Sequence, residues 1–199
     1  MTKKEEIIEA TLDLASLYGL KSLSMSQIAE RVGIKKPSLY NHFDSKESLI
    51  NEMYKFIREK SKENLSLSNV DYMSYMKDKS ASEILNGYVI NYKKMVSDEK
   101  MMKFYKVIYS ERTTNQDAAK ILIDETNKMI EATKMLFSYL KESNKLNIDN
   151  VDMAAISFSM TIHSLIDNEL DHEMIGEKYN KNLIQDYIKW FCNLYSKEK

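Results

Sequence analysis

The sequence predicts an all-α protein with about nine helices. Only four glycines and one proline occur in 199 residues, so few positions interrupt a helix. Apolar residues recur with the 3.6-residue period of an amphipathic helix in one segment after another. The length leaves room for a small N-terminal unit and a larger helical one, each with its own core. We expect the first to span residues 1–46 and the second residues 47–199.

The first predicted helix covers residues 4–18. Ile8, Leu12 and Ala15 repeat at the spacing of a buried helix face. Gly19 follows directly, and glycine commonly ends a helix. The segment therefore predicts one amphipathic helix that packs its apolar side against the rest of the N-terminal unit.

Two short helices joined by a tight turn follow within residues 23–46. Ser24 and Gln27 have the spacing of a capping box, in which each side chain accepts a hydrogen bond from the other residue's backbone N–H. Gly33 ends the first helix because glycine readily takes the left-handed conformation found past a helix end. Pro37 opens the second, where a missing N–H costs little.

The second helix of the pair has a polar outer edge. Leu39 and Phe43, four residues apart, form its inward face. The outward, flanking and entrance positions hold Lys35, Lys36, Pro37, Ser38, Tyr40, Asn41 and His42. Such a helix suits the DNA major groove, where side chains meet base edges and cations meet phosphates. Short helix pairs joined by glycine also occur in proteins that bind no DNA, and the pattern alone leaves both interpretations open.

A dense series of short motifs runs from Tyr18 to Leu49. They are Tyr18-Gly19, Leu23-Ser24, Ile28-Ala29, Val32-Gly33-Ile34, Ser38-Leu39-Tyr40, His42-Phe43 and Ser45-Lys46-Glu47 with Leu49. In this order they closely resemble the N-terminal DNA-binding domain of the TetR family of transcriptional regulators. The resemblance implies a three-helix helix-turn-helix domain followed by a larger helical domain that binds an effector and forms a dimer.

The resemblance also implies which residues meet DNA. It places Ser24 and Ser26 at the start of the supporting helix, near a phosphate or a base. The residues at the major groove or on the DNA backbone are Lys35, Lys36, Pro37, Ser38, Tyr40, Asn41, His42 and Lys46. Family members often carry a threonine and a basic residue where this chain has Met25 and Ser26. The base preference of relatives therefore does not transfer to this chain.

The overall charge does not itself indicate a nucleic-acid binder. The net charge is -1 and the pI is near 6.3, without the basic excess of many such proteins. Local placement has to compensate: lysines cluster at the proposed contact helix, with Lys3, Lys4 and Lys21 as additional candidates. Because binding to phosphates releases condensed counterions, we expect operator affinity to fall steeply with salt.

The remaining chain predicts a series of longer helices. Their expected ranges are 45–64, 81–96, 98–109, 115–143, 151–170 and 178–195. Tyrosine and methionine in the middle three would suit a pocket for a hydrophobic, aromatic or cationic effector. The candidate pocket residues are Tyr88, Tyr92, Met102, Tyr105, Tyr109 and Met129. Ordinary helical core is the better explanation for any one of these residues, and the pocket is predicted only for some members of the group.

The last two predicted helices carry broad apolar faces. Such faces imply burial on two sides, once against the domain and once against another subunit. The predicted interface residues are Val151, Ala155, Phe158, Ile162, Leu165, Ile184, Tyr187, Ile188 and Phe191. The resemblance implies a four-helix dimer interface, and a monomeric bundle with a wide core is the alternative.

The sequence gives little indication of a catalytic site or a metal-binding site. Cys192 is the only cysteine, and His163 with Asp167 lacks the further ligands that a metal site needs. The chain has no G-x-S-x-G elbow and no glycine-rich phosphate loop. We expect neither an enzyme nor a cofactor. With no apolar run long enough for a bilayer and a charged N-terminus, we also expect no membrane contact and a cytoplasmic location.

The sequence thus predicts a homodimeric, ligand-responsive transcriptional regulator. Its expected partners are a double-stranded DNA operator and a small effector of unknown identity. Repression of a palindromic operator is the favoured mode. The alternatives are an activator of the same fold, or a helical protein that binds or sequesters a small molecule without specific DNA binding.

Overall fold

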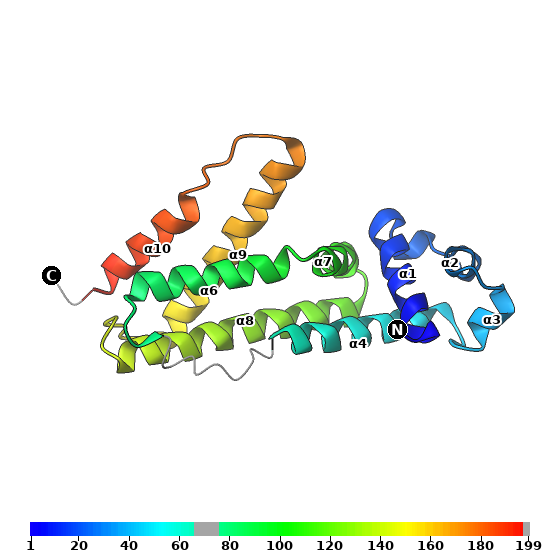
Figure 1. Cartoon of the computed structure of the whole chain (residues 1–199), viewed down its shortest axis with the longest axis horizontal. Helices are drawn as coiled ribbons and strands as arrows, with labels where there is room; N and C mark the ends of the chain where they lie inside the picture. Colours follow the sequence, from blue (N-terminus) through cyan, green and yellow to red (C-terminus); the bar gives the residue numbers. More distant parts are fainter. Residues whose placement is uncertain (66–75, 197–199) are drawn as a thin grey trace. The chain divides into compact units, whose positions relative to one another are not determined.

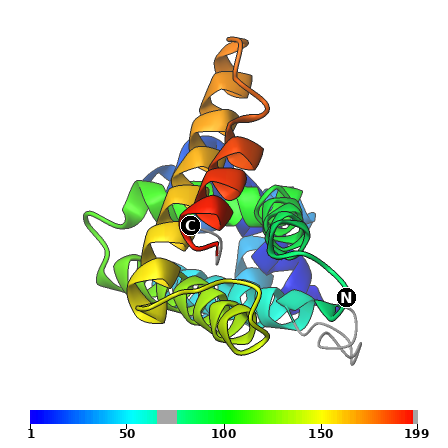
Figure 2. The same cartoon turned by 90° about the vertical axis from the view of Figure 1, so that its left-hand side faces the viewer.

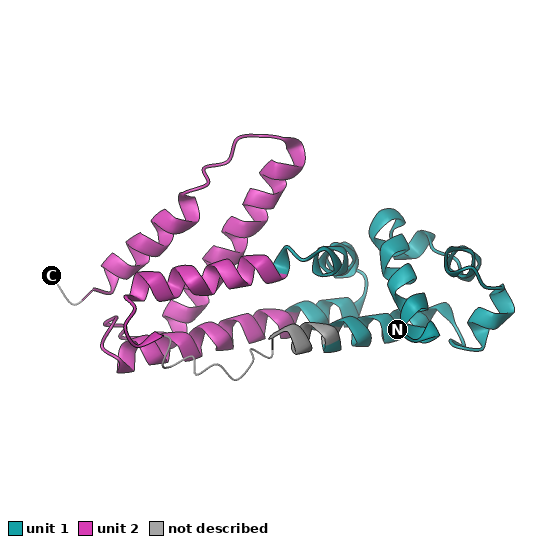
Figure 3. Ribbon diagram, viewed as in Figure 1, with its two compact units in different colours: residues 1–69, 96–122 teal, residues 70–95, 123–199 magenta. Residues whose placement is uncertain are grey.

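The computed structural model describes residues 1–65 and 76–196. Those residues form nine α-helices and one short 3₁₀ helix, with no strand among them, which confirms the predicted all-α class (Figure 1). They group into two compact units (Figure 3). Unit 1 comprises residues 1–69 and 96–122, and unit 2 comprises residues 70–95 and 123–199. The functional boundary expected between residues 46 and 47 stays a prediction.

Helix α1 (Lys3–Tyr18) is the central helix of unit 1. Thr2 caps it: its hydroxyl accepts from the Glu5 N–H at 3.2 Å, and the Glu5 carboxylate accepts from the Thr2 N–H at 2.7 Å. The helix packs against α2 (Met25–Val32), α4 (Lys46–Leu65) and α7 (Glu99–Glu111). A 3₁₀ helix (Leu20–Ser22) leads from α1 to α2.

Local sequence chemistry sets the bounds of α2 as predicted, whereas α3 ends at Tyr40, so Phe43 lies beyond the helix on whose inward face it was predicted. The Ser24 N–H donates to Gln27 Oε1 at 2.9 Å, and the Gln27 N–H donates to Ser24 Oγ at 3.3 Å, which completes the capping box. Gly33 ends α2 with φ 72° and ψ 29°, a conformation that side chains with a Cβ disfavour. Helix α3 (Lys36–Tyr40) follows, with Pro37 in its first turn.

The core of unit 1 is mainly aliphatic. Its buried members come from the N-terminal helices, α4, α7 and the start of α8 (Gln116–Glu142). Fully or almost fully buried residues include Ile7, Ile28, Leu39, Leu49, Met53, Phe104, Ile108 and Ala118. Burial of Leu39 in this core holds α3 in place, since its five residues are too few for independent stability.

Unit 2 contains most of α6 (Ala81–Val96) and α8 together with α9 (Val151–Ile175) and α10 (Leu183–Leu194). Helices α9 and α10 lie side by side in both views (Figures 1 and 2). Phe137, Phe158 and Phe191 meet in its core, each 2% exposed or less. Their ring centroids lie 4.9–5.3 Å apart, so one aromatic cluster joins α8, α9 and α10.

The predicted ends of the last two helices were wrong by about one turn. Helix α9 continues to Ile175 because nothing before Gly176, at φ 69°, interrupts it. Helix α10 starts at Leu183. Just before it, the side-chain oxygen of Asn180 accepts a hydrogen bond from the Asn182 N–H at 3.1 Å. Polar residues are equally common in the exposed terminal turn of a helix and in the loop beyond it. Periodicity alone therefore does not locate the end of the helix.

Candidate nucleic-acid interface and ligand cavity

Helix α3 and its entrance present a continuous exposed set of side chains. Ser24 and Ser26 at the start of α2 are exposed, as are all the predicted contact residues from Lys35 to His42. Tyr40, for example, is 43% exposed although it is aromatic. Lys46, at the start of α4, is half-buried. The structure therefore leaves the predicted side chains accessible while Leu39 and Phe43 anchor the segment from beneath.

The lysines of unit 1 fall into two electrostatic groups. Among the described residues, no carboxylate lies within ion-pair distance of Lys35, Lys36 or Lys46. Lys3 instead pairs with Glu6 at 2.5 Å, and Lys4 pairs with Glu52 at 2.9 Å. The first group is available for an external anion such as a DNA phosphate, whereas the helper role expected for Lys3 and Lys4 requires breaking an internal pair.

Lys4 connects α1 with α4 beneath the contact segment. Its Nζ lies over the Phe43 ring, 5.5 Å from the centroid, as well as beside Glu52. Lys55 also pairs with Glu52, at 3.3 Å. Hydrogen bonds from Lys4 and Lys55 lower the pKa of Glu52 from its ordinary value. This cluster braces Phe43, the residue that closes the turn after α3.

Two further ion pairs tie α7 to α1. Lys100 donates to Glu9 at 2.6 Å, and Lys103 donates to Asp13 at 2.8 Å and to Glu99 at 2.7 Å. The hydrogen bonds that Lys103 donates to Asp13 and Glu99 raise the pKa of Lys103 to about 12. A displacement of α7 would therefore act directly on the helix against which α2 packs.

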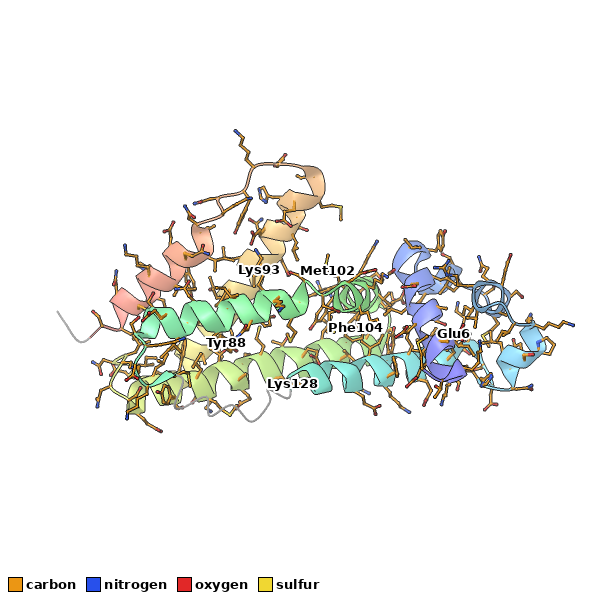
Figure 4. All side chains as sticks on the ribbon, in the orientation of Figure 1. Glu6, Tyr88, Lys93, Met102, Phe104 and Lys128 are labelled. Carbon is orange, nitrogen blue, oxygen red and sulfur yellow. The ribbon has the colours of Figure 1, made fainter. Side chains whose placement is uncertain are left out.

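Unit 2 contains a hollow between α6, α8 and α9. It is lined by Tyr88, Tyr92, Met129, Thr133, Phe158, Ser159 and Ile162, and its free volume is about 10 Å³, the space of about one water molecule. Figure 4 labels Tyr88 between α6 and α8. This volume is far below the ~300–1,000 Å³ typical of small-molecule sites, so any ligand larger than water requires the hollow to widen.

Polar side chains around the hollow are joined by internal hydrogen bonds. The hydroxyls of Tyr88 and Thr133 lie 3.0 Å apart, and the Tyr92 hydroxyl lies 2.8 Å from His163 Nδ1. His163 Nε2 is 3.6 Å from the carboxylate of Asp167. Burial raises the pKa of Asp167, against the opposing effect of His163, and burial likewise raises the pKa of Tyr88.

The structure brings only part of the predicted pocket together. Tyr88, Tyr92 and Met129 line the hollow, whereas Met102, Tyr105 and Tyr109 lie on α7 in unit 1. The residues that sequence reasoning missed are Thr133, Phe158, Ser159 and Ile162. Helical spacing could have indicated them, because Thr133 follows Met129 by four residues and Ile162 follows Phe158 by four.

The residues assigned to the dimer interface lie mostly inside unit 2. Six of the nine are buried within the chain itself, namely Ala155, Phe158, Ile162, Ile184, Ile188 and Phe191. Val151, Leu165 and Tyr187 are half-buried. A side chain already enclosed by its own subunit adds no new buried area in a dimer. The apolar groups exposed on α9 and α10 are Met153, Ile156, Met160, Leu183, Trp190 and Leu194.

Other site types are not found in the described part of the chain. No group of three or more His, Cys, Asp or Glu side chains there is placed to hold a metal ion. None of the described helices combines the length and apolarity needed to cross a bilayer. Cys192 is half-buried, and this partial burial raises the pKa of its thiol to about 11, which disfavours a reactive thiolate.

Two family models match this chain in adjacent segments. "Bacterial regulatory proteins, tetR family" matches residues 7–53, which include α2, α3 and the candidate nucleic-acid interface. "AefR-like transcriptional repressor, C-terminal domain" matches residues 83–197, more than half of the chain. The second match includes the lining of the hollow.

Curated relatives match the N-terminal region. The tetracycline repressor protein class G of Vibrio anguillarum is 33% identical over 85 residues, 41% of this chain and 40% of that protein. The biofilm operon regulator IcaR of Staphylococcus aureus (strain Newman), named a negative transcriptional regulator, is 42% identical over 52 residues, 26% of this chain and 28% of that protein. The chain thus matches less than half the length of these relatives.

Solved structures match over almost the whole length. A TetR-family regulator from Mesorhizobium loti has a TM-score of 0.71 at 17% identity, covering 98% of this chain and 96% of that one. The flavonoid-responsive regulator FrrA has a TM-score of 0.65 at 21% identity, covering 99% and 98%. At such low identity these likenesses show the fold alone.

Proposed function

The chain belongs to the TetR family of bacterial transcriptional regulators, and from this premise we propose that it is a homodimeric repressor, which a small effector releases from a palindromic operator. Family members are DNA-binding regulators and not enzymes, as the sequence predicted. Relatives named as repressors support the repressing mode. A regulator of this kind acts where the chromosome lies, so the proposed location is the cytoplasm.

The observation that carries the proposal is the exposed, anion-accessible edge of α3. Ser38, Tyr40 and Asn41 offer groups that hydrogen-bond to bases or phosphates, and Lys35 and Lys36 stand at the entrance without internal carboxylate partners among the described residues. A five-residue helix is short enough for most of its outer edge to enter the major groove. The proposed contacts are the ten residues predicted from the sequence.

A two-fold dimer would present two such edges to one DNA duplex. We propose that Ile156, Met160 and Trp190 form part of this interface, because they are 39%, 46% and 56% exposed on adjacent helices. Exposed apolar groups on two neighbouring helices form the kind of contiguous surface that marks a protein contact. An isologous contact between two copies then requires a palindromic operator.

Effector response requires the effector to bind one conformation better than the other. In this proposal the hollow of unit 2 receives the effector. Helix α8 contributes to both units, since Ala118 and Ile121 belong to the unit 1 core while Met129 and Thr133 line the hollow. Within unit 1, the Lys100 and Lys103 pairs would pass a shift of α7 to α1.

Alanine substitution at Tyr40, His42 and Lys46 tests the DNA-binding part. We expect the triple variant to lose at least ~100-fold in operator affinity, since several base and phosphate contacts of 1–3 kcal/mol each are removed. Fluorescence anisotropy with the gene's own promoter fragment measures the loss. A matched variant, Tyr18→Ala with His172→Ala and Lys189→Ala, changes the same residue types away from α3.

The control triple should keep the affinity of the natural protein. Equal affinity of both triples would reject the assigned interface. If the natural protein itself binds no promoter fragment specifically yet binds small molecules, the sequestration function applies instead. A reporter fused to the promoter distinguishes repression from activation by the sign of the change when this gene is deleted.

A further inference from the structure

We propose that Gln27 is a further contact to the DNA backbone, and that its side-chain amide donates a hydrogen bond to a phosphate while its carbonyl oxygen caps α2. This inference rests on the DNA binding proposed above and adds one residue to the proposed contacts. It follows from the way in which the capping box of α2 fixes the two ends of this amide.

The capping box determines which way the Gln27 amide faces. The backbone N–H of Ser24 can only donate, so the amide atom 2.9 Å from it must be the oxygen Oε1 and not the nitrogen. The same oxygen accepts the Ser24 hydroxyl hydrogen at 2.8 Å. Oε1 therefore faces Ser24 with two hydrogen bonds, and Nε2 is the end of the amide that is left for another partner.

The two hydrogens of Gln27 Nε2 are available to an external acceptor. Gln27 is exposed, and no acceptor among the described residues lies within hydrogen-bond distance of Nε2. Because the cap already holds the side chain in one place, little rotamer freedom remains to be lost when a partner binds. The amide is thus a pre-positioned donor in the first turn of α2, in the unit that also contains the exposed edge of α3.

Ser24 is a poorer donor at the same place. Its hydroxyl hydrogen is donated to Gln27 Oε1, and its oxygen accepts the Gln27 N–H at 3.3 Å. A hydrogen bond from the Ser24 hydroxyl to a phosphate would break the first of these bonds. The donor role expected of Ser24 therefore passes, in this proposal, to the Gln27 amide.

A phosphate is the DNA group that suits this amide. Glutamine reads adenine with its oxygen and nitrogen together, but Oε1 of Gln27 already accepts two hydrogen bonds and only the donor half is left. Phosphate oxygens only accept, and glutamine is among the side chains that commonly donate to them. Glu30 and Arg31, exposed one turn further along α2, carry opposite charges, so the charge of these neighbours favours neither an anion nor a cation beside Gln27.

Two other helices show that a carboxylate can form the same cap. Thr2 and Glu5 cap α1 in this way, and Ser80 and Glu83 precede and begin α6 with the same pattern. The Ser80 N–H and hydroxyl donate to Glu83 Oε2 at 2.8 and 2.6 Å, and the Glu83 N–H donates to Ser80 Oγ at 3.2 Å. A glutamate in place of Gln27 should therefore complete the cap, but its second oxygen would repel a phosphate that the amide attracts.

Gln27→Glu separates the capping role from the DNA contact. The full-length variant should melt at the same temperature as the natural protein, because the cap is retained. Its operator affinity, measured by fluorescence anisotropy with the promoter fragment, should fall at least ~30-fold, since repulsion replaces a hydrogen bond to a charged group at each half-site. Gln116→Glu is the matched control and should keep the natural affinity. Gln116 is also exposed, also lies in the first turn of a helix in unit 1, and receives the same change of charge.

Uncharged positions in the DNA backbone test the phosphate contact directly. Each phosphate of one operator half-site is replaced in turn by a methylphosphonate, which lacks the negative charge, and the natural protein and Gln27→Glu are both measured. At the contacted position the natural protein should lose affinity at least ~3-fold, because its hydrogen bond to a charged oxygen is weakened. Gln27→Glu should gain at least ~3-fold at that position, because the repulsion is removed.

The outcomes separate this inference from the general function. Natural operator affinity in Gln27→Glu, an equal loss in Gln116→Glu, or no position at which the two proteins respond oppositely to methylphosphonate would each overturn the Gln27 contact and leave the repressor function standing. If Gln27→Glu is less stable, the opposite response still decides, because each protein is compared with itself on two DNAs. A natural protein that binds no promoter fragment specifically would reject both the function and the contact.

Discussion

The two units hold their helices together by different means. In unit 1, an aliphatic core joins the helices, and the polar contacts between them are ion pairs at the surface: Lys4 with Glu52, Lys100 with Glu9, and Lys103 with Asp13. Every partner in these pairs is at least 30% exposed. In unit 2, aromatic rings and enclosed hydrogen bonds connect α6, α8, α9 and α10, and the Glu169 carboxylate paired with Lys93 is only 10% exposed.

This contrast fits the proposed division of work. Salt weakens exposed charge pairs and affects buried contacts much less. Breaking the surface pairs of unit 1 should therefore cost little, whereas its aliphatic core still holds α1, α4 and α7 together. The unit that carries the hollow keeps a firm aromatic wall against which a ligand can be recognised.

Truncating the aromatic core of unit 2 should have the largest effect. Phe158→Ala removes a fully buried ring that contacts Phe137 and Phe191, and should lower the free energy of unfolding by about 3–5 kcal/mol. Urea denaturation followed by circular dichroism measures it. The aliphatic counterpart in unit 1, Leu39→Ala, should cost about 2–5 kcal/mol. A loss below about 1 kcal/mol for Phe158→Ala would contradict the described core.

The exposed apolar surface of unit 2 comes next. Ile156→Glu combined with Met160→Glu should weaken the dimer ~30-fold or more, because charges are placed where apolar area is proposed to be buried. Sedimentation equilibrium gives the dissociation constant. Ile90→Glu on α6, whose parent side chain is 61% exposed, is the control and should leave the dimer intact. Comparable weakening by the control would assign the interface elsewhere.

One tyrosine in each unit makes a matched pair. The hydroxyl of buried Tyr54 in unit 1 has no hydrogen-bond partner among the described residues, and burial raises its pKa to about 12. Tyr54→Phe should therefore stabilise the protein by about 1 kcal/mol. Tyr88→Phe in unit 2 breaks the bond to Thr133 and should destabilise it by a similar amount. Thermal unfolding of both variants measures the two changes in stability, which should have opposite signs. Changes of the same sign would contradict the described difference between the two hydroxyls.

The exposed ion pairs should contribute least. A double-mutant cycle with Lys4→Met and Glu52→Gln should give a coupling of about 1 kcal/mol or less. That coupling should shrink between 0.05 and 0.5 M salt, since ~0.5 M salt screens exposed charges within a few ångströms. The same cycle at Lys93 and Glu169 should keep more of its value. A coupling energy between Lys4 and Glu52 that does not change with salt concentration would contradict the contrast between the units.

Acid titration tests the same pair with a definite sign. The folded pKa of Glu52 lies below its ordinary 4.5, so its stabilising contribution is present above pH 4.5 and is lost as pH falls through the folded value. Glu52→Gln should accordingly flatten the loss of stability below pH 4.5. Carbon-detected NMR of the Glu52 carboxyl gives the pKa directly, and a value above 4.5 would show that the Lys4 bridge is absent in solution.

Local chemistry made the N-terminal features predictable. Ser24 with Gln27, the left-handed Gly33 and Pro37 in the first turn of α3 act within a few residues of one another, so spacing alone locates these helix ends. Exposure of the α3 edge follows from the same local periodicity. The family resemblance extends over this very region, which is why the candidate DNA contacts could be named in advance.

Neighbours distant in sequence had to be seen in the tertiary structure. Phe158 and Ile162 were predicted for a dimer interface, yet their side chains are enclosed by their own subunit. Lys4 is held by Glu52, 48 residues away, whereas Lys35 and Lys36 are not held by any described carboxylate. Helical periodicity shows that a face is apolar or charged. Only the packing of other helices decides whether that face meets the core, a second subunit or DNA.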